Sequence, residues 1–273
     1  MRAALAVFKA WMTILRRYPG WLFMDLLWPF VSVAFPVVIG TAVAGSYAKA
    51  VQNFHQRVPG VDPLAFFILG AATMSVISEA LWRFGTFIRW QQRVGTLESL
   101  LLTPADTTSI LAGISLYSMT RAMITFFGFI TISDLILHLG LLGPRLLPGV
   151  ALIFLGVLPV FGMSMMLGVF VLWFREVGNV VSIVEWGLYT ISGVLYPVWF
   201  FPRAIRVISA LLPSTWMVGD VRAVVLGTQY LLGNPVYDLM VLGLMVPAWL
   251  FAGRATFGFV LGRLKRGEGV SRF

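Results

Sequence analysis

Residues 148–174 read PGVALIFLGVLPVFGMSMMLGVFVLWF, without one charged side chain. A helix rises ~1.5 Å per residue and the hydrocarbon core of a bilayer is ~30 Å thick, so about 20 apolar residues cross it. An uncharged stretch of this length predicts a transmembrane helix. This one stretch therefore indicates a membrane protein.

The whole chain has the same character. Of its 273 residues, 59% are hydrophobic and 11% are charged, whereas soluble domains carry about 25% charged residues. A chain of this size has too little core to hide such a surplus of apolar residues in water, so a large soluble catalytic domain is excluded. Six stretches have crossing length, and we expect an all-α membrane protein with six transmembrane helices at 21–44, 63–84, 108–139, 148–174, 180–200 and 236–262.

Lysine and arginine are unevenly distributed around these crossings. The segments before the first crossing and after the second, fourth and sixth hold twelve of the 20 basic residues, and the opposite loops hold six. Basic residues are enriched on the cytoplasmic side of membrane proteins. We therefore expect a multi-pass protein of the inner (plasma) membrane with both termini in the cytoplasm. The charges are expected to face the lipid bilayer and its anionic headgroups, with no nucleic acid as a partner.

Residues 1–20 precede the transmembrane domain, which we place at 21–273. Apolar side chains recur at helical spacing while basic ones point elsewhere, which predicts an amphipathic helix in the membrane surface. The apolar positions are Leu5, Phe8, Met12 and Leu15.

Residues 201–233 are too polar and too interrupted to cross. Pro213, Gly219 and Gly227 break the segment, and Asp220 and Arg222 add charge. Irregular backbone at membrane depth needs protein or water to satisfy its polar groups. We expect short re-entrant or interfacial helices here, on the outer side between the fifth and sixth crossings.

The cytoplasmic loop at 85–106 contains the stretch GTLESLLLTP at 95–104. Leu97, Leu100 and Leu101 share one face of a helix, Thr96 can cap it, and Pro104 ends it. Gly95 gives the chain freedom to enter the helix. Such a short apolar-faced helix either seats in a groove of another protein or packs as a linker on its own bundle.

The stretch at 95–104 resembles the G-T-L-E-x-L-L-x-T-P sequence of the type-2 ABC exporter permeases. A second resemblance follows the fifth crossing, where the order is a small-Gly-x-x-x-Pro motif, Leu-Pro-x-Thr, Asp-x-Arg and a closing Gly. The matching residues are SGVLYP at 192–197, FP at 201–202, LPST at 212–215, Asp220, Arg222 and Gly227. With the basic N-terminus and six crossings, the resemblance covers essentially the whole chain.

The resemblance implies a partner and a division of labour. Such permeases pair as dimers of identical or related chains, and each bears a cytoplasmic ATPase subunit with a cleft for the coupling helix. The residues that match the coupling helix are Gly95, Thr96, Leu97, Glu98, Leu100, Leu101, Thr103 and Pro104. The residues that match the outer gate are Pro197, Pro202, Pro213, Asp220 and Arg222. This chain has no G-x-x-x-x-G-K-[ST] phosphate loop, so it is not itself the enzyme, and ATP and Mg are expected on the partner subunit.

Asp25, Glu79, Arg121 and Glu185 lie inside predicted crossings, where a charge facing lipid costs a few kcal/mol. Arg121 lies about 13 residues into its crossing, which is ~20 Å of helix, and needs an acidic partner. Glu79 and Glu185 are the candidates, although both look shallower than Arg121. These groups either line a water-filled path or lock helices together.

Other functions fit the sequence less well. A secondary transporter or channel predicts inverted repeats, yet neither 95–104 nor 197–227 has a second copy. A membrane enzyme needs convergent His, Asp or Ser residues, and the chain has no cysteine and only the isolated His55 and His138, so no metal or other cofactor site is expected. The LPST motif resembles the drug and antibiotic branch. We expect export of an amphiphile, a drug, antibiotic or lipid, with lipid-linked polysaccharide export as the alternative.

Overall fold

The computed structural model describes residues 2–95, 107–173 and 177–265, and within them the chain forms ten α-helices, one 3-10 helix and no strand. Five of the helices are long and apolar enough to cross a membrane. They are α2 (Gly20–Ala44), α4 (Pro63–Arg93), α6 (Thr107–Leu137), α7 (Leu146–Trp173) and α11 (Pro235–Lys265). The all-helical class and five of the six predicted crossings are confirmed as helices.

The predicted fifth crossing at 180–200 is wrong in its second half. Helix α8 covers Val177–Ile191 only, and its 15 residues fall below the crossing length of the other five. The chain then turns through Gly193, which has a φ of 81°, and forms the 3-10 helix η1 (Val198–Phe200) after Pro197. A positive φ suits glycine and proline cannot continue a helix, so these two residues end α8 although the hydropathy stays high.

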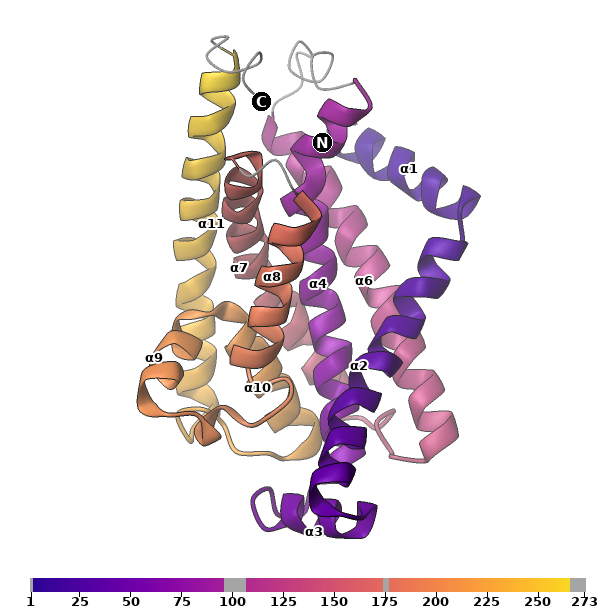
Figure 1. The fold of residues 1–273 in the computed structure, drawn as a ribbon. Helices are drawn as coiled ribbons and strands as arrows, with labels where there is room; N and C mark the ends of the chain where they lie inside the picture. Colours follow the sequence, from indigo (N-terminus) through magenta and orange to yellow (C-terminus); the bar gives the residue numbers. More distant parts are fainter. Residues whose placement is uncertain (1, 96–106, 174–176, 266–273) are drawn as a thin grey trace.

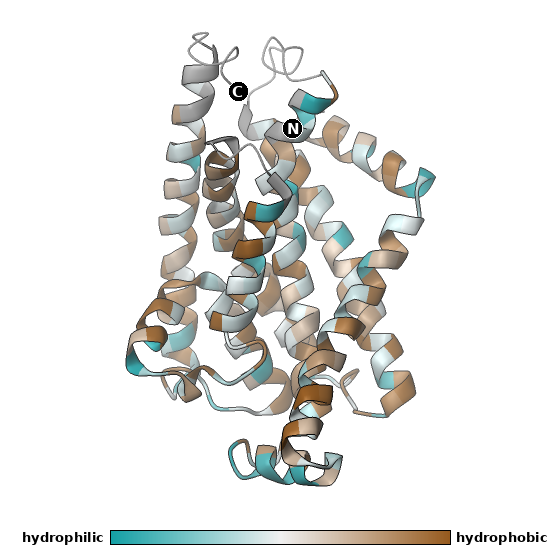
Figure 2. Ribbon diagram, in the orientation of Figure 1, coloured by the Kyte–Doolittle hydropathy of each residue, from teal (hydrophilic) through white to brown (hydrophobic). Residues whose placement is uncertain are grey.

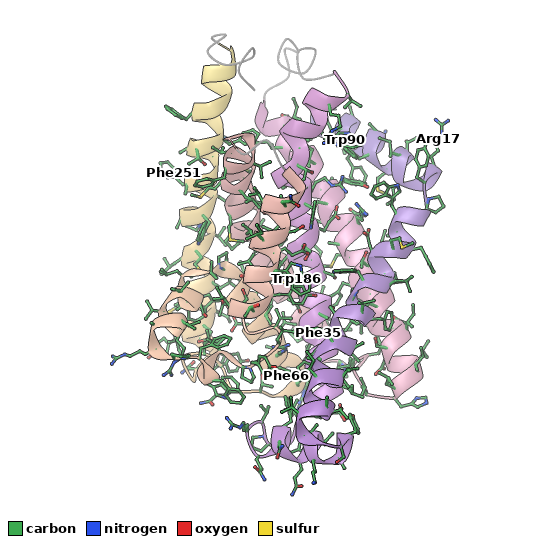
Figure 3. The ribbon with its side chains drawn as sticks, in the orientation of Figure 1. Arg17, Phe35, Phe66, Trp90, Trp186 and Phe251 are labelled. Atoms are coloured by element: carbon green, nitrogen blue, oxygen red, sulfur yellow. The ribbon has the colours of Figure 1, made fainter. Side chains whose placement is uncertain are left out.

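Helix α4 is the centre of the bundle (Figure 1). It packs against α2, α6, α7, α8 and α10, and 72% of its crossing window is buried inside the protein. The corresponding share is 11% for α2 and 17% for α11. Those two helices therefore present most of their apolar side chains outward, and Phe251 on α11 points away from the bundle in Figure 3.

Helices α7 and α11 approach each other closely because glycines face each other at their crossing. A Cβ on Gly162 would collide with the backbone of Trp249, and one on Gly253 would collide with the backbone of Gly162. Small residues at such crossings let membrane helices gain van der Waals contact along their backbones. This crossing holds the otherwise exposed α11 to the core.

Helix α1 (Arg2–Arg17) lies across the bundle and joins α2 through a bend at Pro19 (Figure 1). The predicted amphipathic helix is confirmed as a helix. It packs on α6, where Gly113 leaves room for the carbonyl of Ala4 and the rings of Trp11 and Tyr117 lie 5.6 Å apart. Its place in the membrane surface stays a prediction.

The start of α1, the end of α4, the start of α6 and the end of α11 share one end of the bundle (Figure 1). The opposite end carries α3 (Tyr47–His55), α9 (Arg203–Leu211) and α10 (Pro213–Leu226). Hydrophilic residues gather on α3, whereas the long helices are mostly neutral to hydrophobic (Figure 2). The two ends match the two faces that the charge distribution predicts.

Candidate functional site

Four charged side chains form one connected cluster inside the bundle. Arg121 of α6 donates from Nη2 to Asp25 of α2 and lies 3.3 Å through Nη1 from Oε2 of Glu79 on α4. Arg83, one turn further along α4, donates to Oε1 of the same glutamate at 2.8 Å. Two positive and two negative charges alternate, so the cluster is electrically neutral. Neutrality and mutual hydrogen bonds are what buried charges require.

Two aromatic rings cover the cluster on the side of α1. The guanidinium of Arg83 lies 4.9 Å from the ring centroid of Trp11 and 4.8 Å from that of Tyr117. A cation over an aromatic face is attracted by the ring quadrupole, more strongly where water is excluded. The cluster therefore ties α1, α2, α4 and α6 together through side chains.

The predicted difference in depth between Arg121 and Glu79 is wrong, because the two side chains are in contact. Asp25 lies five residues after α2 begins at Gly20, and Arg121 lies fourteen residues after α6 begins at Thr107. Because the two residues are in contact, the first residue of α6 lies roughly 13 Å further along the bundle than the first residue of α2. Glu79 is at the matching level because α4 also continues past this point to Arg93. The cluster thus lies near the end of the bundle that holds α1, and Glu79 is a partner of Arg121 after all.

Glu185 takes a different partner. Its Oε2 accepts a hydrogen bond of 2.9 Å from Nε1 of Trp82, which joins α8 to α4. Within the described residues, no ion pair joins Glu185 to Arg121. Tyr189, one turn further along α8, donates to Oγ of Ser32 on α2 at 3.2 Å. These contacts make α8 a bridge between α4 and α2.

The prolines of the outer segment start its helices. Pro197 precedes η1, Pro202 precedes α9, and Pro213 is the first residue of α10. Proline fits these places because its missing N–H would be unsatisfied at a helix start in any case. The predicted outer segment is confirmed as two short helices, α9 and α10. Their arrangement relative to a bilayer stays a prediction.

Serine side chains fasten this segment to the end of α8. Ser192 and Ser214 share a hydrogen bond of 2.6 Å between their hydroxyls, and Ser209 donates to the carbonyl of Ile191 at 2.8 Å. Trp216 of α10 donates from Nε1 to the carbonyl of Ala210. Helix α10 is buried along most of its length, whereas Val207, Ile208 and Leu211 of α9 are exposed.

Arg222, which lies in the predicted outer segment, is buried inside the protein. Its guanidinium donates to the carbonyls of Phe66, Gly193 and Val194 at 3.0, 2.6 and 2.7 Å. It also lies over the ring of Phe66, which Figure 3 places towards the end of the bundle that carries α3, α9 and α10. Two of these carbonyls follow the C-terminus of α8, where the negative end of the helix dipole favours a nearby cation. Arg222 thus joins α4, α8 and α10 at one point.

The other charged residue of the Asp-x-Arg motif, Asp220, is also buried. Helical spacing places it on a different side of α10 from Arg222. It lies near Asp238 of α11. The two charged residues of the Asp-x-Arg motif therefore connect α10 to different neighbours.

The coupling segment is described only at its first residue. Gly95 follows the end of α4 with a φ of 71°, a conformation that favours glycine. Thr96, Leu97, Glu98, Leu100, Leu101, Thr103 and Pro104 lie outside the described residues. Helices α4 and α6, which flank this segment, both contribute to the charged cluster.

Some residues of these sites were not predicted from the sequence. Arg83 is four residues from Glu79, a spacing that places both on one helix face and could have signalled the ion pair. The roles of Trp11 and Gly70 depend on helix crossings that no local pattern encodes. Gly70 faces Arg222, and a Cβ there would overlap the guanidinium.

The fold and these sites define a multi-pass helical membrane protein whose helices are joined by buried charged side chains. Among the described residues, no group of three or more His, Cys, Asp and Glu side chains is placed to hold a metal ion. The sequence profile of the ABC-2 family transporter proteins matches residues 64–252, well over half of the chain. The chain belongs to this family, as its motifs predict. It is therefore a membrane subunit of an ABC transporter. No curated protein matches it as a relative.

Proposed function

We propose that this chain is the permease subunit of an ATP-driven exporter, which moves an amphiphilic substrate out of the cytoplasm or the inner leaflet by alternating access. The family match over residues 64–252 carries the proposal. It spans the coupling segment, the members of the charged cluster on α4 and α6, and the whole outer segment. A separate ATPase subunit binds ATP and Mg and supplies the force, and a second permease chain completes the transporter.

The cluster supplies a route for that force. Helices α4 and α6 emerge on either side of the coupling segment, so a push on the segment moves both of them. Arg121 then transmits the motion to α2 through Asp25, and Arg83 transmits it to α1 through Trp11. Ion pairs and packed helices of this kind have discrete arrangements and can carry a switch between states. We assign the cluster the role of a lock between helices rather than a lining of the substrate path.

The proposed topology has six crossings. Helix α8 is the fifth, and its 15 residues span ~22 Å. The outer helices α9 and α10 occupy the part of the membrane that α8 is too short to span, and they form the outer gate. Both termini lie in the cytoplasm, and the membrane is the inner (plasma) membrane.

The amphiphilic substrate is supported by the LPST motif at 212–215, which resembles drug and antibiotic exporters, and by the apolar character of the helices. A lipid-linked polysaccharide remains the alternative cargo. A screen of compounds for stimulation of ATP hydrolysis by the purified complex distinguishes the two.

Changing Glu98 to Ala tests the coupling role. The complex with the neighbouring ATPase is expected to lose transport by roughly fivefold or more, in line with coupling energies of 1–3 kcal/mol. The yield of folded permease should be unchanged. Transport, ATP hydrolysis and yield are measured together, with Ser99→Ala in the same segment as the matched control. Equal transport in the absence of any ATPase would contradict the proposal and favour a secondary transporter.

The topology is tested by single cysteines, which need no background removal because the chain has none. A membrane-impermeant thiol reagent should label Ser99→Cys from the cytoplasmic side only. It should label Gln229→Cys, whose position is exposed after α10, from the outside only. The reverse pattern would overturn the orientation, and labelling of both from one side would overturn the six crossings.

A further inference from the structure

Asp220 of α10 is the one side chain of the described residues whose two carboxylate oxygens are both buried without a hydrogen-bond donor. Its residue is 1% exposed. An ionised carboxylate without a donor in such a place costs several kcal/mol, and proteins avoid this by neutralising the group. The structure therefore raises the question of what neutralises Asp220.

The basic residue nearest in sequence does not neutralise it. Arg222 is two residues away, on another side of α10, and its guanidinium donates to the carbonyls of Phe66, Gly193 and Val194. These contacts direct it towards α4 and the end of α8. Arg203 and Arg206 of the adjoining α9 are exposed.

The group that acts on Asp220 is a second carboxyl, that of Asp238 on α11. Asp238 is 0% exposed, and it accepts hydrogen bonds from the backbone N–H groups of Leu231 and Leu232 at 2.8 and 3.0 Å. Two amide donors stabilise a negative charge on a carboxylate. Both oxygens of Asp238 thus have a hydrogen-bond donor, and neither oxygen of Asp220 has one.

We propose that Asp220 and Asp238 form a proton-binding site, in which a proton on Asp220 is donated to the carboxylate of Asp238 and joins α10 to α11. The shared proton removes one of two like charges and gives the orphaned oxygen of Asp220 its hydrogen bond. Asp238 keeps its amide donors on the turn between the helices. Asp220 takes this proton from water and forms an O–H bond, and the proton returns to water when Asp220 ionises.

The electrostatics of the site agree with this geometry. Burial, and then the charge of Asp238, raise the pKa of Asp220 from 3.8 to about 8. Tyr230, in the turn between α10 and α11, is the other titratable group near the pair, and burial and the two carboxyls raise its pKa as well. Among the described groups, these are the ionisable neighbours that act on Asp220 or are acted on by it.

The sign of the pH dependence follows from the proton count. Between about pH 4 and pH 8 the folded protein holds a proton on Asp220 that the unfolded chain has released. Stability therefore falls as the pH rises through this window and becomes flat above it. Asp220→Asn keeps the shape and can donate its amide N–H to Asp238 at any pH, so this slope should disappear.

The experiment uses the full-length permease alone, in detergent or nanodiscs, and is thus independent of the exporter proposal. Unfolding temperature is recorded from mildly acidic to mildly alkaline pH for the wild type, Asp220→Asn and Asp134→Asn. Asp134 is the matched control because its carboxylate, like that of Asp238, accepts hydrogen bonds from two backbone N–H groups, those of Leu141 and Leu142. We expect Asp220→Asn to lose most of the wild-type slope between about pH 4 and pH 8 and Asp134→Asn to keep it.

Infrared spectroscopy of the wild type provides a second readout that needs no variant to fold. The carbonyl band of a protonated carboxyl should be present at neutral pH and vanish at alkaline pH, with a midpoint near 8. Absence of this band at neutral pH would overturn the proposal. So would a rise in unfolding temperature on adding Na⁺, K⁺ or Ca²⁺ at neutral pH, because that would place a metal cation between the carboxylates.

Discussion

Replacing Arg121 with Gln is expected to lower the free energy of unfolding by about 3 kcal/mol, because it leaves two buried carboxylates without their shared cation. Arg121 is the residue that joins Asp25 to Glu79, and its side chain is 10% exposed. Glu79 keeps Arg83 as a partner in the variant, but Asp25 loses the one ion pair that it forms within the described residues. Chemical or thermal unfolding of the purified permease measures the loss.

A double-mutant cycle tests whether the loss comes from this contact. Asp25→Asn alone should cost less, since its side chain is 32% exposed and water can replace part of the interaction. The double variant should be about as stable as Arg121→Gln, because the second change removes a charge that is already unpaired. Arg145→Gln, an exposed residue at the opposite end, is the control and should change stability by about 0.5 kcal/mol at most. Simple additivity of the two single losses would show that Arg121 and Asp25 do not interact.

Hydropathy and charge predict the membrane-protein class and most of the helices, because both can be read directly from the local sequence. The uncharged run at 148–174 predicts α7, and Pro213 predicts the break between α9 and α10. The expected break at Gly219 is wrong, because this residue lies inside α10. The early end of α8 at Ile191 escapes such reasoning. Residues 192–200 are as apolar as a crossing, and the left-handed turn at Gly193 followed by Pro197 separates them from the helix.

The pairing of the charges depends on how far each helix extends beyond its neighbours. Counting from the predicted ends of crossings places Arg121 too deep for Glu79, because α4 and α6 continue past the start of α2. Asp25 is recognisable from the sequence as a charge inside a crossing, but its partner is not. The coupling helix motif and the outer motif are recognised through resemblance, and only the outer one lies in the described part of the chain.

The second large effect on stability is expected from Gly70→Ala, which adds one methyl group near the start of α4. The new Cβ would overlap Nη2 and Cζ of Arg222. That guanidinium cannot easily move, since three carbonyls and the ring of Phe66 surround it and Arg222 is 3% exposed. Overpacking costs 1–3 kcal/mol, and each lost hydrogen bond to a charged group costs a further 1.5–3. We therefore expect a loss of about 3 kcal/mol or more, or no folded protein.

Two comparisons assign that loss to the clash. Gly243→Ala on α11 is the matched control, because nothing lies within 4 Å of its added Cβ and alanine is the better helix former. It should leave stability unchanged or raise it by up to about 1 kcal/mol. In an Arg222→Met background, which is itself destabilised by the loss of the buried hydrogen bonds, Gly70→Ala should add little further loss. If Gly70→Ala costs as much there as in the wild type, the close fit between α4 and Arg222 does not exist. A small cost in both backgrounds would mean that the guanidinium has room to move, and that Arg222 does not hold α4, α8 and α10 together as tightly as its three hydrogen bonds indicate.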